Sequence, residues 1–263
     1  MMCKDCGLMT YSPRPETADI DAQYAYLDER QTPIGTRPFD ENDRGTLRRI
    51  RRVHAFLASH LPPRTLRILD YGGSDGKLLV PFLRDDHDCE VVDYHPEPLK
   101  GIHRRGSTLE DIPQEMRYDV ILCSHVLEHL SEPGELLRQL SARLTEGGLL
   151  YVEVPNEIWR GTPITYDPVT HVNFFNRVNI ALLCQQKADL GIIATRTGRE
   201  QFGAWRVKVT GILARKGAKR IEIPLPSALN ATQRLQRPSL AAALAHLFEI
   251  RIPNKIARLR SEV

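Results

Sequence analysis

The chain has 263 residues, of which 41% are hydrophobic and 26% are charged, and its formal net charge is only +3. This balance is ordinary for a globular protein that buries a core without disulfides, and so small a charge gives no support for nucleic-acid binding. No apolar run approaches the ~20 residues of a membrane-spanning helix, and the first residues contain no apolar signal core. We therefore expect a cytoplasmic protein without a transmembrane segment.

The five cysteines are Cys3, Cys6, Cys89, Cys123 and Cys184. An odd number, with three of them in apolar stretches, predicts reduced thiols rather than a disulfide framework. The spacing of Cys3 and Cys6, followed by a glycine, is typical of half a zinc knuckle. Because structural zinc takes four ligands and no second pair is visible, the sequence predicts an incomplete zinc site. It is either vestigial or completed by residues that precede this sequence.

Three regions are expected along the chain: an N-terminal arm over 1–43, a main domain over 44–215 and a basic helical extension over 216–263. Residues 16–26 of the arm can form a helix. The polar stretch 28–43 contains two prolines and a glycine, which predicts a loop. This loop is either a lid over the main domain or a plain linker.

Residues 44–60 carry apolar side chains at helical spacing and predict an amphipathic helix. Its arginines are expected to form the solvated face, and these are Arg48, Arg49, Arg51 and Arg52. In the extension, the apolar stretch 240–250 predicts a second such helix among mostly basic charges. We expect it to cover the core, to form a homodimer contact or to rest on an anionic surface.

Residues 68–79 read Ile-Leu-Asp-Tyr-Gly-Gly-Ser-Asp-Gly-Lys-Leu-Leu, a short apolar strand, a glycine-rich turn and the start of a helix. The glycines are Gly72, Gly73 and Gly76. Without a Cβ they let the backbone approach a ligand, and the first N–H groups of the helix point into the same space. Ser74 holds the middle small position, so the turn is not the dinucleotide fingerprint. The carboxylate of Asp70 suits a ligand with ammonium and sulfonium charges better than a pyrophosphate.

A second apolar strand, 89–93, ends at Asp93, where nucleotide-binding α/β folds place a carboxylate on ribose hydroxyls. Glu110 and Asp111 can accept the amino group of an adenine. A third strand, 118–123, runs directly into the next candidates. The full set of expected cofactor-binding residues is Asp70, Gly72, Gly73, Ser74, Gly76, Asp93, Tyr94, Glu110, Asp111, Ser124 and His125.

These segments, followed by a Thr-Glu-Gly-Gly turn and a fourth strand over 145–155, resemble in order the motifs of class I S-adenosylmethionine-dependent methyltransferases. The resemblance covers about residues 45–215. It implies an α/β fold with a Rossmann-like, mostly parallel sheet, an antiparallel last strand, flanking helices and S-adenosylmethionine as the cofactor.

Four more elements complete this domain in the sequence. Residues 136–144 and 178–190 predict helices, and Gly191 is expected to cap the second one. Residues 192–197 and 205–214 alternate as strands. The resemblance implies that the second of these pairs antiparallel at the edge of the sheet.

The third strand is followed by His125, Glu128 and His129, which share one helical face. The string also matches an inverted zinc-peptidase motif, but its place after a strand of a cofactor-binding sheet argues against that function. Ubiquinone-pathway O-methyltransferases have a similar Glu-x-x-Glu-His that is proposed to hold a divalent ion, with His125 here in place of the first Glu. Either His129 is a catalytic base supported by Glu128, or the segment fixes the loop under the cofactor.

His171 is the other candidate base. The stretch from His171 to Phe175 resembles a His-x-x-Phe segment of sugar and natural-product methyltransferases, which implies a place where acceptor and methyl group meet. The alternative is a turn that packs two phenylalanines on the sheet. Residues expected to line the acceptor pocket are Glu153, Asn156, Trp159 and Tyr166.

The resemblance implies methyl transfer to a small hydroxylated acceptor, such as a sugar, a nucleotide-sugar, a polysaccharide or a secondary-metabolite intermediate. The alternative is a non-catalytic cofactor-binding module or partner subunit that docks through the basic extension. Methylation of a nucleic-acid base amine is disfavoured, because Ser124-His125-Val126 stands where such enzymes carry Asn/Asp-Pro-Pro-Tyr/Phe.

Overall fold

The structure is a computed structural model that describes residues 3–29, 40, 43–94, 97–156, 170–202 and 205–224. The helices are α1 (Thr17–Glu29), α2 (Arg44–Ala58), α3 (Val80–Arg84), α4 (Pro133–Ala142) and α5 (Arg177–Lys187), with 3-10 turns η1 (Lys77–Leu79), η2 (Leu109–Asp111) and η3 (Leu127–His129). The strands are β1 (Met9–Thr10), β2 (Arg67–Tyr71), β3 (Asp88–Val92), β4 (His103–Gly106), β5 (Tyr118–Ser124), β6 (Leu144–Pro155), β7 (Asn173–Phe174), β8 (Leu190–Phe202) and β9 (Trp205–Lys216). Most of the expected loop 28–43, Trp159, Tyr166 and the apolar stretch 240–250 lie outside the described residues.

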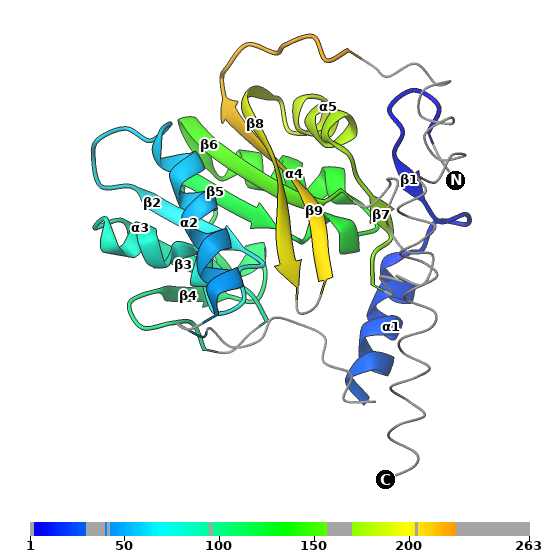
Figure 1. Cartoon of the computed structure of the whole chain (residues 1–263), viewed down its shortest axis with the longest axis horizontal. Helices are drawn as coiled ribbons and strands as arrows, with labels where there is room; N and C mark the ends of the chain where they lie inside the picture. Colours follow the sequence, from blue (N-terminus) through cyan, green and yellow to red (C-terminus); the bar gives the residue numbers. More distant parts are fainter. Residues whose placement is uncertain are drawn as a thin grey trace.

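A seven-stranded sheet organises the main domain, in the order β4-β3-β2-β5-β6-β9-β8 (Figure 1). The strands from β4 to β6 pair in parallel, and β9 is antiparallel to both of its neighbours. The expected Rossmann-like methyltransferase sheet is confirmed. One detail of the prediction was wrong: β9 lies between β6 and β8, so β8 forms the edge.

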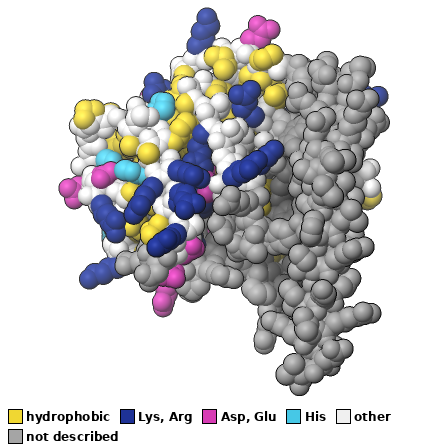
Figure 2. Space-filling model, in the orientation of Figure 1, with side chains coloured by type: hydrophobic (Ala, Val, Ile, Leu, Met, Phe, Trp, Pro, Cys, Tyr) yellow, Lys and Arg dark blue, Asp and Glu magenta, His cyan; other side chains and the backbone are white. Residues whose placement is uncertain are grey.

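Helices cover both faces of this sheet, as strands buried on two sides require. On one face α2 and α3 pack through Ile50, Val53, Leu57 and Phe82. The three buried residues of α2 have the spacing that predicted its amphipathic character. Lys and Arg side chains gather on the outer side of α2 (Figure 2). This face therefore carries an apolar inner layer and a basic outer one.

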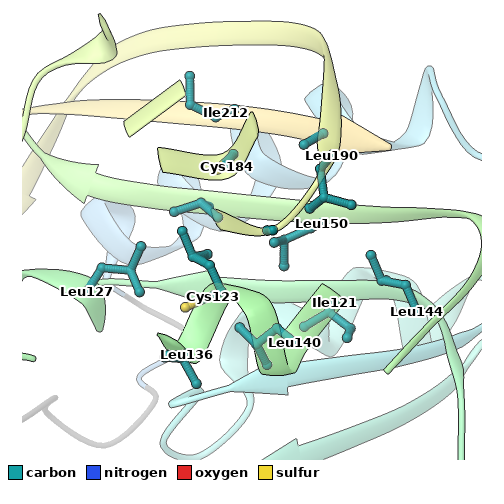
Figure 3. Packing of buried hydrophobic residues seen from close by; sticks show 14 of the residues in the cluster. Ile121, Cys123, Leu127, Leu136, Leu140, Leu144, Leu150, Cys184, Leu190 and Ile212 are labelled. Carbon is teal, nitrogen blue, oxygen red and sulfur yellow. The ribbon is translucent and has the colours of Figure 1, made fainter. Parts of the chain in front are cut away.

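The opposite face is covered by α4 and α5. Leu136 and Leu140 of α4 pack with Cys184 of α5 against Ile121 and Leu150 of the central strands (Figure 3). Burying side chains of this size contributes about 1.5–3 kcal/mol each. The two-sided core fixes the central strands, so that their carboxyl ends form a stable platform for a site.

Gly191 has a different role from the expected one. α5 ends at Lys187, and the left-handed residue after it is Asp189 with φ of 55°, so Gly191 is not a cap but part of β8. A Cβ on Gly191 would lie 2.5 Å from the carbonyl oxygen of Ala218, which explains a glycine inside a strand. Aspartate tolerates the left-handed region better than most residues.

The expected Thr-Glu-Gly-Gly turn lies inside β6 as an irregularity. Tyr118 pairs with Leu144, but Val120 already pairs with Leu149, so β6 holds extra residues at this point. Gly147 has φ of 73° there. The backbone therefore makes a local turn at Gly147, as in a β-bulge, and β6 continues beyond it.

The N-terminal arm packs on the main domain. β1 pairs antiparallel with β7, with Met9 opposite Phe174. The Oγ1 of Thr10 donates to the carbonyl oxygen of Val172 at 2.9 Å. These contacts bring the arm to the segment that contains His171. Among the described residues, no helix has both the length and the apolar character needed to cross a bilayer.

Candidate active site

The glycine-rich turn after β2 forms a cradle at the carboxyl end of the sheet. Gly72 and Gly76 have φ of 69° and 81°, which glycine adopts without strain. A Cβ on Gly73 would lie 2.5 Å from the carboxyl carbon of Asp70, so only glycine lets the backbone pass this close. The backbone N–H of Ser74 donates to Oδ2 of Asp93 at 2.8 Å. The structure thus brings together the predicted residues of the turn.

Asp70 is the electrostatic centre of this cradle. The residue is 1% exposed, and neither carboxylate oxygen has a hydrogen-bond partner among the described residues. Burial raises its pKa to about 7, against the opposing charge of Arg49. An ionised carboxylate in this setting is stabilised by a cation. The cradle and the buried acid therefore fit S-adenosylmethionine, which carries ammonium and sulfonium charges.

The remaining predicted cofactor residues differ in their surroundings. Tyr94 follows β3 and is 81% exposed. Oδ2 of Asp111 accepts the backbone N–H groups of Ser107 and Thr108, at 2.7 and 2.9 Å, so this carboxylate caps η2. Glu110 lies exposed on the same turn. Contact between adenine and Glu110 or Asp111 stays a prediction, and Asp111 already has a structural role.

A buried ion network stands behind the cradle. Nη2 of Arg49 donates to Oγ of Ser124 at 2.6 Å and to Oε1 of Glu153 at 3.0 Å. Arg196 reaches the other carboxylate oxygen of Glu153 at 2.9 Å. Burial alone would raise the pKa of Glu153, but the charges of Arg49, His125 and Arg196 lower it to about 2. Glu153 is therefore a fixed anion.

This network corrects two expectations. Arg49 does not belong to the solvated face, because its side chain is 16% exposed and turned onto the sheet. Glu153 is 0% exposed and held by two arginines, so it is no lining residue of an open acceptor pocket. The sequence did contain a sign of this. Arg49 stands four residues before Val53, on the helical stripe that is buried.

Glu128, His129 and His171 come together next to the carboxyl end of β5. Each offers a ligand atom, and these atoms lie within 4.8 Å of one another. The rings of His129 and His171 meet edge to face at 4.7 Å between centroids. Nδ1 of His125 contacts Oε1 of Glu128 at 3.1 Å. The structure therefore brings together the predicted catalytic residues, although His129 and His171 are 42 positions apart in the sequence.

Hydrogen bonds define which atoms of this cluster can react. Nδ1 of His129 lies 3.0 Å from the carbonyl oxygen of Thr170, and a carbonyl only accepts, so Nδ1 carries the proton. Nε2 then presents a lone pair, 3.9 Å from Oε1 of Glu128. Burial lowers the pKa of His129. Burial would raise the pKa of Glu128, but the hydrogen bond from His125 and the neighbouring histidines lower it. The cluster combines neutral imidazole with carboxylate.

The arm closes this cluster from outside. The ring of Tyr24 on α1 lies 6.3 Å from that of His129. Arg14 donates to the carbonyl oxygen of Ser131 and, at 2.9 Å, to Oδ1 of Asn173. Asn173 in turn donates to the loop that carries His129, at the carbonyl oxygens of Leu127 and Leu130. Sequence reasoning missed Arg14, Tyr24 and Asn173, since no motif links these distant positions.

A zinc site at the two cysteines of the arm stays a prediction. The backbone of Gly7 donates to the carbonyl oxygen of Cys3, which forms the turn expected of a knuckle. Hydrogen bonds from the backbone of Cys6 lower the pKa of Cys3, and burial raises that of Cys6. Within the described ranges these thiols do not belong to a group of three metal-ligating side chains. All five cysteines are free thiols.

Fold and site together define a class I S-adenosylmethionine-dependent methyltransferase, as expected from the sequence. The fold resembles that of the 1,6-didemethyltoxoflavin-N1-methyltransferase of Burkholderia thailandensis, solved with S-adenosylhomocysteine, with a TM-score of 0.52, 18% identity, and coverage of 76% of this chain and 88% of that chain. It also resembles N-methyltransferase NodS of Bradyrhizobium japonicum WM9 in complex with S-adenosylhomocysteine, with a TM-score of 0.53, 14% identity, and coverage of 74% and 98%.

A family model described as a methyltransferase domain matches residues 39–195, more than half of the chain, and the chain belongs to this family. Among curated proteins, the ubiquinone biosynthesis O-methyltransferase of Bradyrhizobium sp. (strain ORS 278) is 33% identical over an alignment of 108 residues, and the match covers 36% of this chain. The match spans 42% of that protein's length.

Proposed function

We propose that this chain transfers a methyl group to a hydroxyl oxygen of a small acceptor, with His171 as the general base beside His129 and Glu128. The observation that carries the proposal is the Glu128–His129–His171 cluster, whose reactive atoms lie within 4.8 Å of one another. The name of the curated relatives, O-methyltransferase, supports oxygen as the methylated atom. The resemblance of the His171 segment supports a sugar, nucleotide-sugar, polysaccharide or secondary-metabolite intermediate as the acceptor.

Some residues of the site bind the donor, and others take part in proton transfer. S-adenosylmethionine supplies a methyl group on a positively charged sulfur when it is bound. The glycine turn and Asp70 hold this donor through close backbone approach and opposite charge. The acceptor hydroxyl loses its proton to a ring nitrogen of His171 as its oxygen forms the new bond to the methyl carbon, while the bond from that carbon to the donor sulfur breaks and S-adenosylhomocysteine is the leaving group. The carboxylate of Glu128 stabilises the imidazolium that results.

Replacement of His171 by alanine tests this assignment. Loss of a general base is expected to lower kcat by about 10²–10⁴-fold and to leave the affinity for S-adenosylhomocysteine unchanged. The matched control is His103→Ala, which removes an exposed histidine of β4 at the other edge of the sheet. Turnover is measured as release of S-adenosylhomocysteine with a panel of sugars and nucleotide-sugars. Wild-type turnover in H171A would exclude His171 as the base.

The pH dependence gives a second test, centred on His129. Burial lowers its pKa below the ordinary 6.5, so its ring is neutral at pH 7 and stays neutral as the pH falls through 6.5. We expect kcat/KM to hold down to pH 6.5 and to fall only below it. An acid limb centred above pH 6.5 would contradict the assignment of a neutral His129.

A divalent cation bound by the same three residues is the second candidate. Glu128, His129 and His171 offer one carboxylate and two imidazoles, a donor set that suits zinc, manganese or iron(II). A cation there would lower the pKa of a coordinated hydroxyl and replace His171 as the means of deprotonation. Turnover after dialysis against EDTA, with each metal added back, decides between the two. Full activity in the metal-free protein would exclude the cation.

The compartment, the domain boundaries and the assembly are further parts of the proposal. The free thiols support the reducing cytoplasm as the site of action. The division into 1–43, 44–215 and 216–263 is proposed from the sequence. A homodimer through the helix expected at 240–250 is proposed on its apolar composition, and light scattering of the intact chain measures it.

A further inference from the structure

A groove between α2 and the last part of β8 has a volume of about 570 Å³. Its lining residues are Gly45, Arg48, Arg52, Phe56, Arg196, Thr197, Gly198, Arg199 and Glu200. Four of these nine are arginines. The groove lies on the face of the molecule where dark blue side chains gather over α2 and the neighbouring strand (Figure 2).

The charge of the groove is not balanced by the described residues. Arg196 pairs with Glu200 at 2.8 Å and also with Glu153, so this arginine is neutralised from within. Arg48, Arg52 and Arg199 are exposed, and none of them forms an ion pair with a carboxylate in the part of the chain that the structure describes. Arg48 and Arg52 therefore present two guanidinium groups to the groove without a counter-charge among the described residues, while Arg199 contributes its backbone carbonyl.

The arginines come from both walls of the groove. Arg48 and Arg52 stand at i and i+4, on one side of α2, where two like charges repel each other. Nη1 of Arg52 donates to the carbonyl oxygen of Arg199 at 3.3 Å, which joins the helix to the strand. An anion between the walls would relieve the repulsion and accept several forked hydrogen bonds.

The groove lies at the same edge of the sheet as the proposed reaction site. β8 runs parallel to β6, because β9 is antiparallel to both, so the last residues of β8 lie at the carboxyl edge of the sheet. Arg49, the neighbour of Arg48, donates to Ser124 at the end of β5. The next residue, His125, contacts Glu128. A molecule held in the groove by one end can therefore extend toward the catalytic cluster.

We propose that this groove binds the phosphate or pyrophosphate group of the acceptor, so that the substrate is a phosphorylated hydroxylated molecule such as a nucleoside-diphosphate-linked sugar. The inference rests on the proposed function, because it assigns the acceptor of that reaction. Arg48 and Arg52 supply the charge that recognises the anion. Arg196 and its buried partners form the wall that separates the anion from the donor cradle.

Calorimetric titration of the full chain with inorganic pyrophosphate and with uridine diphosphate tests the groove. The double variant R48Q/R52Q removes two exposed guanidiniums, and R51Q is the matched control, since Arg51 is exposed on the same helix but does not line the groove. We expect at least tenfold weaker binding of both probes in the double variant and wild-type binding in R51Q. Titration with S-adenosylhomocysteine verifies that every variant is folded.

Four outcomes of such titrations would overturn the inference. The first is equal pyrophosphate affinity in wild type and R48Q/R52Q. The second is an equal loss in R51Q, which would indicate general charge attraction. The third is displacement of pyrophosphate by saturating S-adenosylhomocysteine, which would assign the arginines to the donor. Tighter binding of a single-stranded oligonucleotide than of uridine diphosphate, weakened by the same variant, would likewise replace the small acceptor by nucleic acid.

Turnover separates this inference from the proposed function. In R48Q/R52Q, kcat/KM should fall at least tenfold for nucleoside-diphosphate sugars and stay unchanged for the same sugars without phosphate. Unchanged kcat/KM for both kinds of sugar would contradict the assignment of the groove as a phosphate site, and the proposed methyl transfer would be unaffected. Absence of turnover with every hydroxylated acceptor, together with specific pyrophosphate binding, would instead overturn the proposed function and leave the anion site.

Discussion

Replacing Asp70 by asparagine should make the ligand-free protein more stable and the donor complex weaker. The residue is 1% exposed, and its carboxylate oxygens have no hydrogen-bond partner among the described residues. Burial raises the pKa from 3.8 to about 7. This difference corresponds to about 4 kcal/mol of destabilisation once the carboxyl group is ionised. Asparagine keeps the shape without the charge, so most of this destabilisation should disappear.

The effect has a defined pH dependence. Between pH 3.8 and about 7 the folded chain holds a proton on Asp70 that the unfolded chain has released. The stability due to the protonated form is complete below pH 3.8 and is lost as the pH rises through about 7. The gain from D70N should therefore reach a few kcal/mol at pH 8 and be much smaller at pH 5.

Urea unfolding at pH 5 and pH 8 measures this difference, with Asp21→Asn on the exposed side of α1 as the control. Calorimetric titration measures the other half of the prediction. Loss of a charged partner is expected to weaken S-adenosylhomocysteine binding by about tenfold or more. A variant that is less stable at pH 8, or one whose gain is the same at both pH values, would refute the assignment of Asp70 as a buried acid without a partner.

Three further substitutions test other parts of the site. Arg49→Ala leaves Glu153 as a buried anion with one arginine fewer and should lower the free energy of unfolding by about 3–5 kcal/mol; a change below 1 kcal/mol in urea unfolding would contradict the buried pair. Arg14→Ala should release the arm, seen as faster amide hydrogen exchange over residues 8–29 with the main domain unchanged. Gly73→Ala places a Cβ 2.5 Å from the carboxyl carbon of Asp70 and should abolish donor binding, and retained affinity would show that the turn can move.

Local patterns predicted most of the fold. The strand and turn that contain Asp70 and Gly73 could be read from adjacent residues, since apolar runs and glycines act within a few positions. The helical spacing of α2 likewise placed Val53 on the buried side. The cofactor cradle was predictable for this reason: its parts are consecutive in the chain or follow successive strands.

Contacts between distant segments could not be predicted in the same way. Arg49 turns inward because it pairs with the buried Glu153. The two residues are 104 positions apart in the sequence, so no local pattern shows the pairing. The place of β9 between β6 and β8 depends on sheet registry and not on composition. The helix cap moved from Gly191 to Asp189 because the glycine was needed where the strand passes close to another backbone.

The pairing of β1 with β7 has a consequence for how the chain assembles as it is synthesised. Thr10 bonds to Val172, which the ribosome adds 162 residues later. Strands β2, β3, β5 and β6 have all been synthesised by then. β1 can therefore take its place only after the strands of the cofactor domain have been made, and the arm encloses the histidine cluster at that late stage.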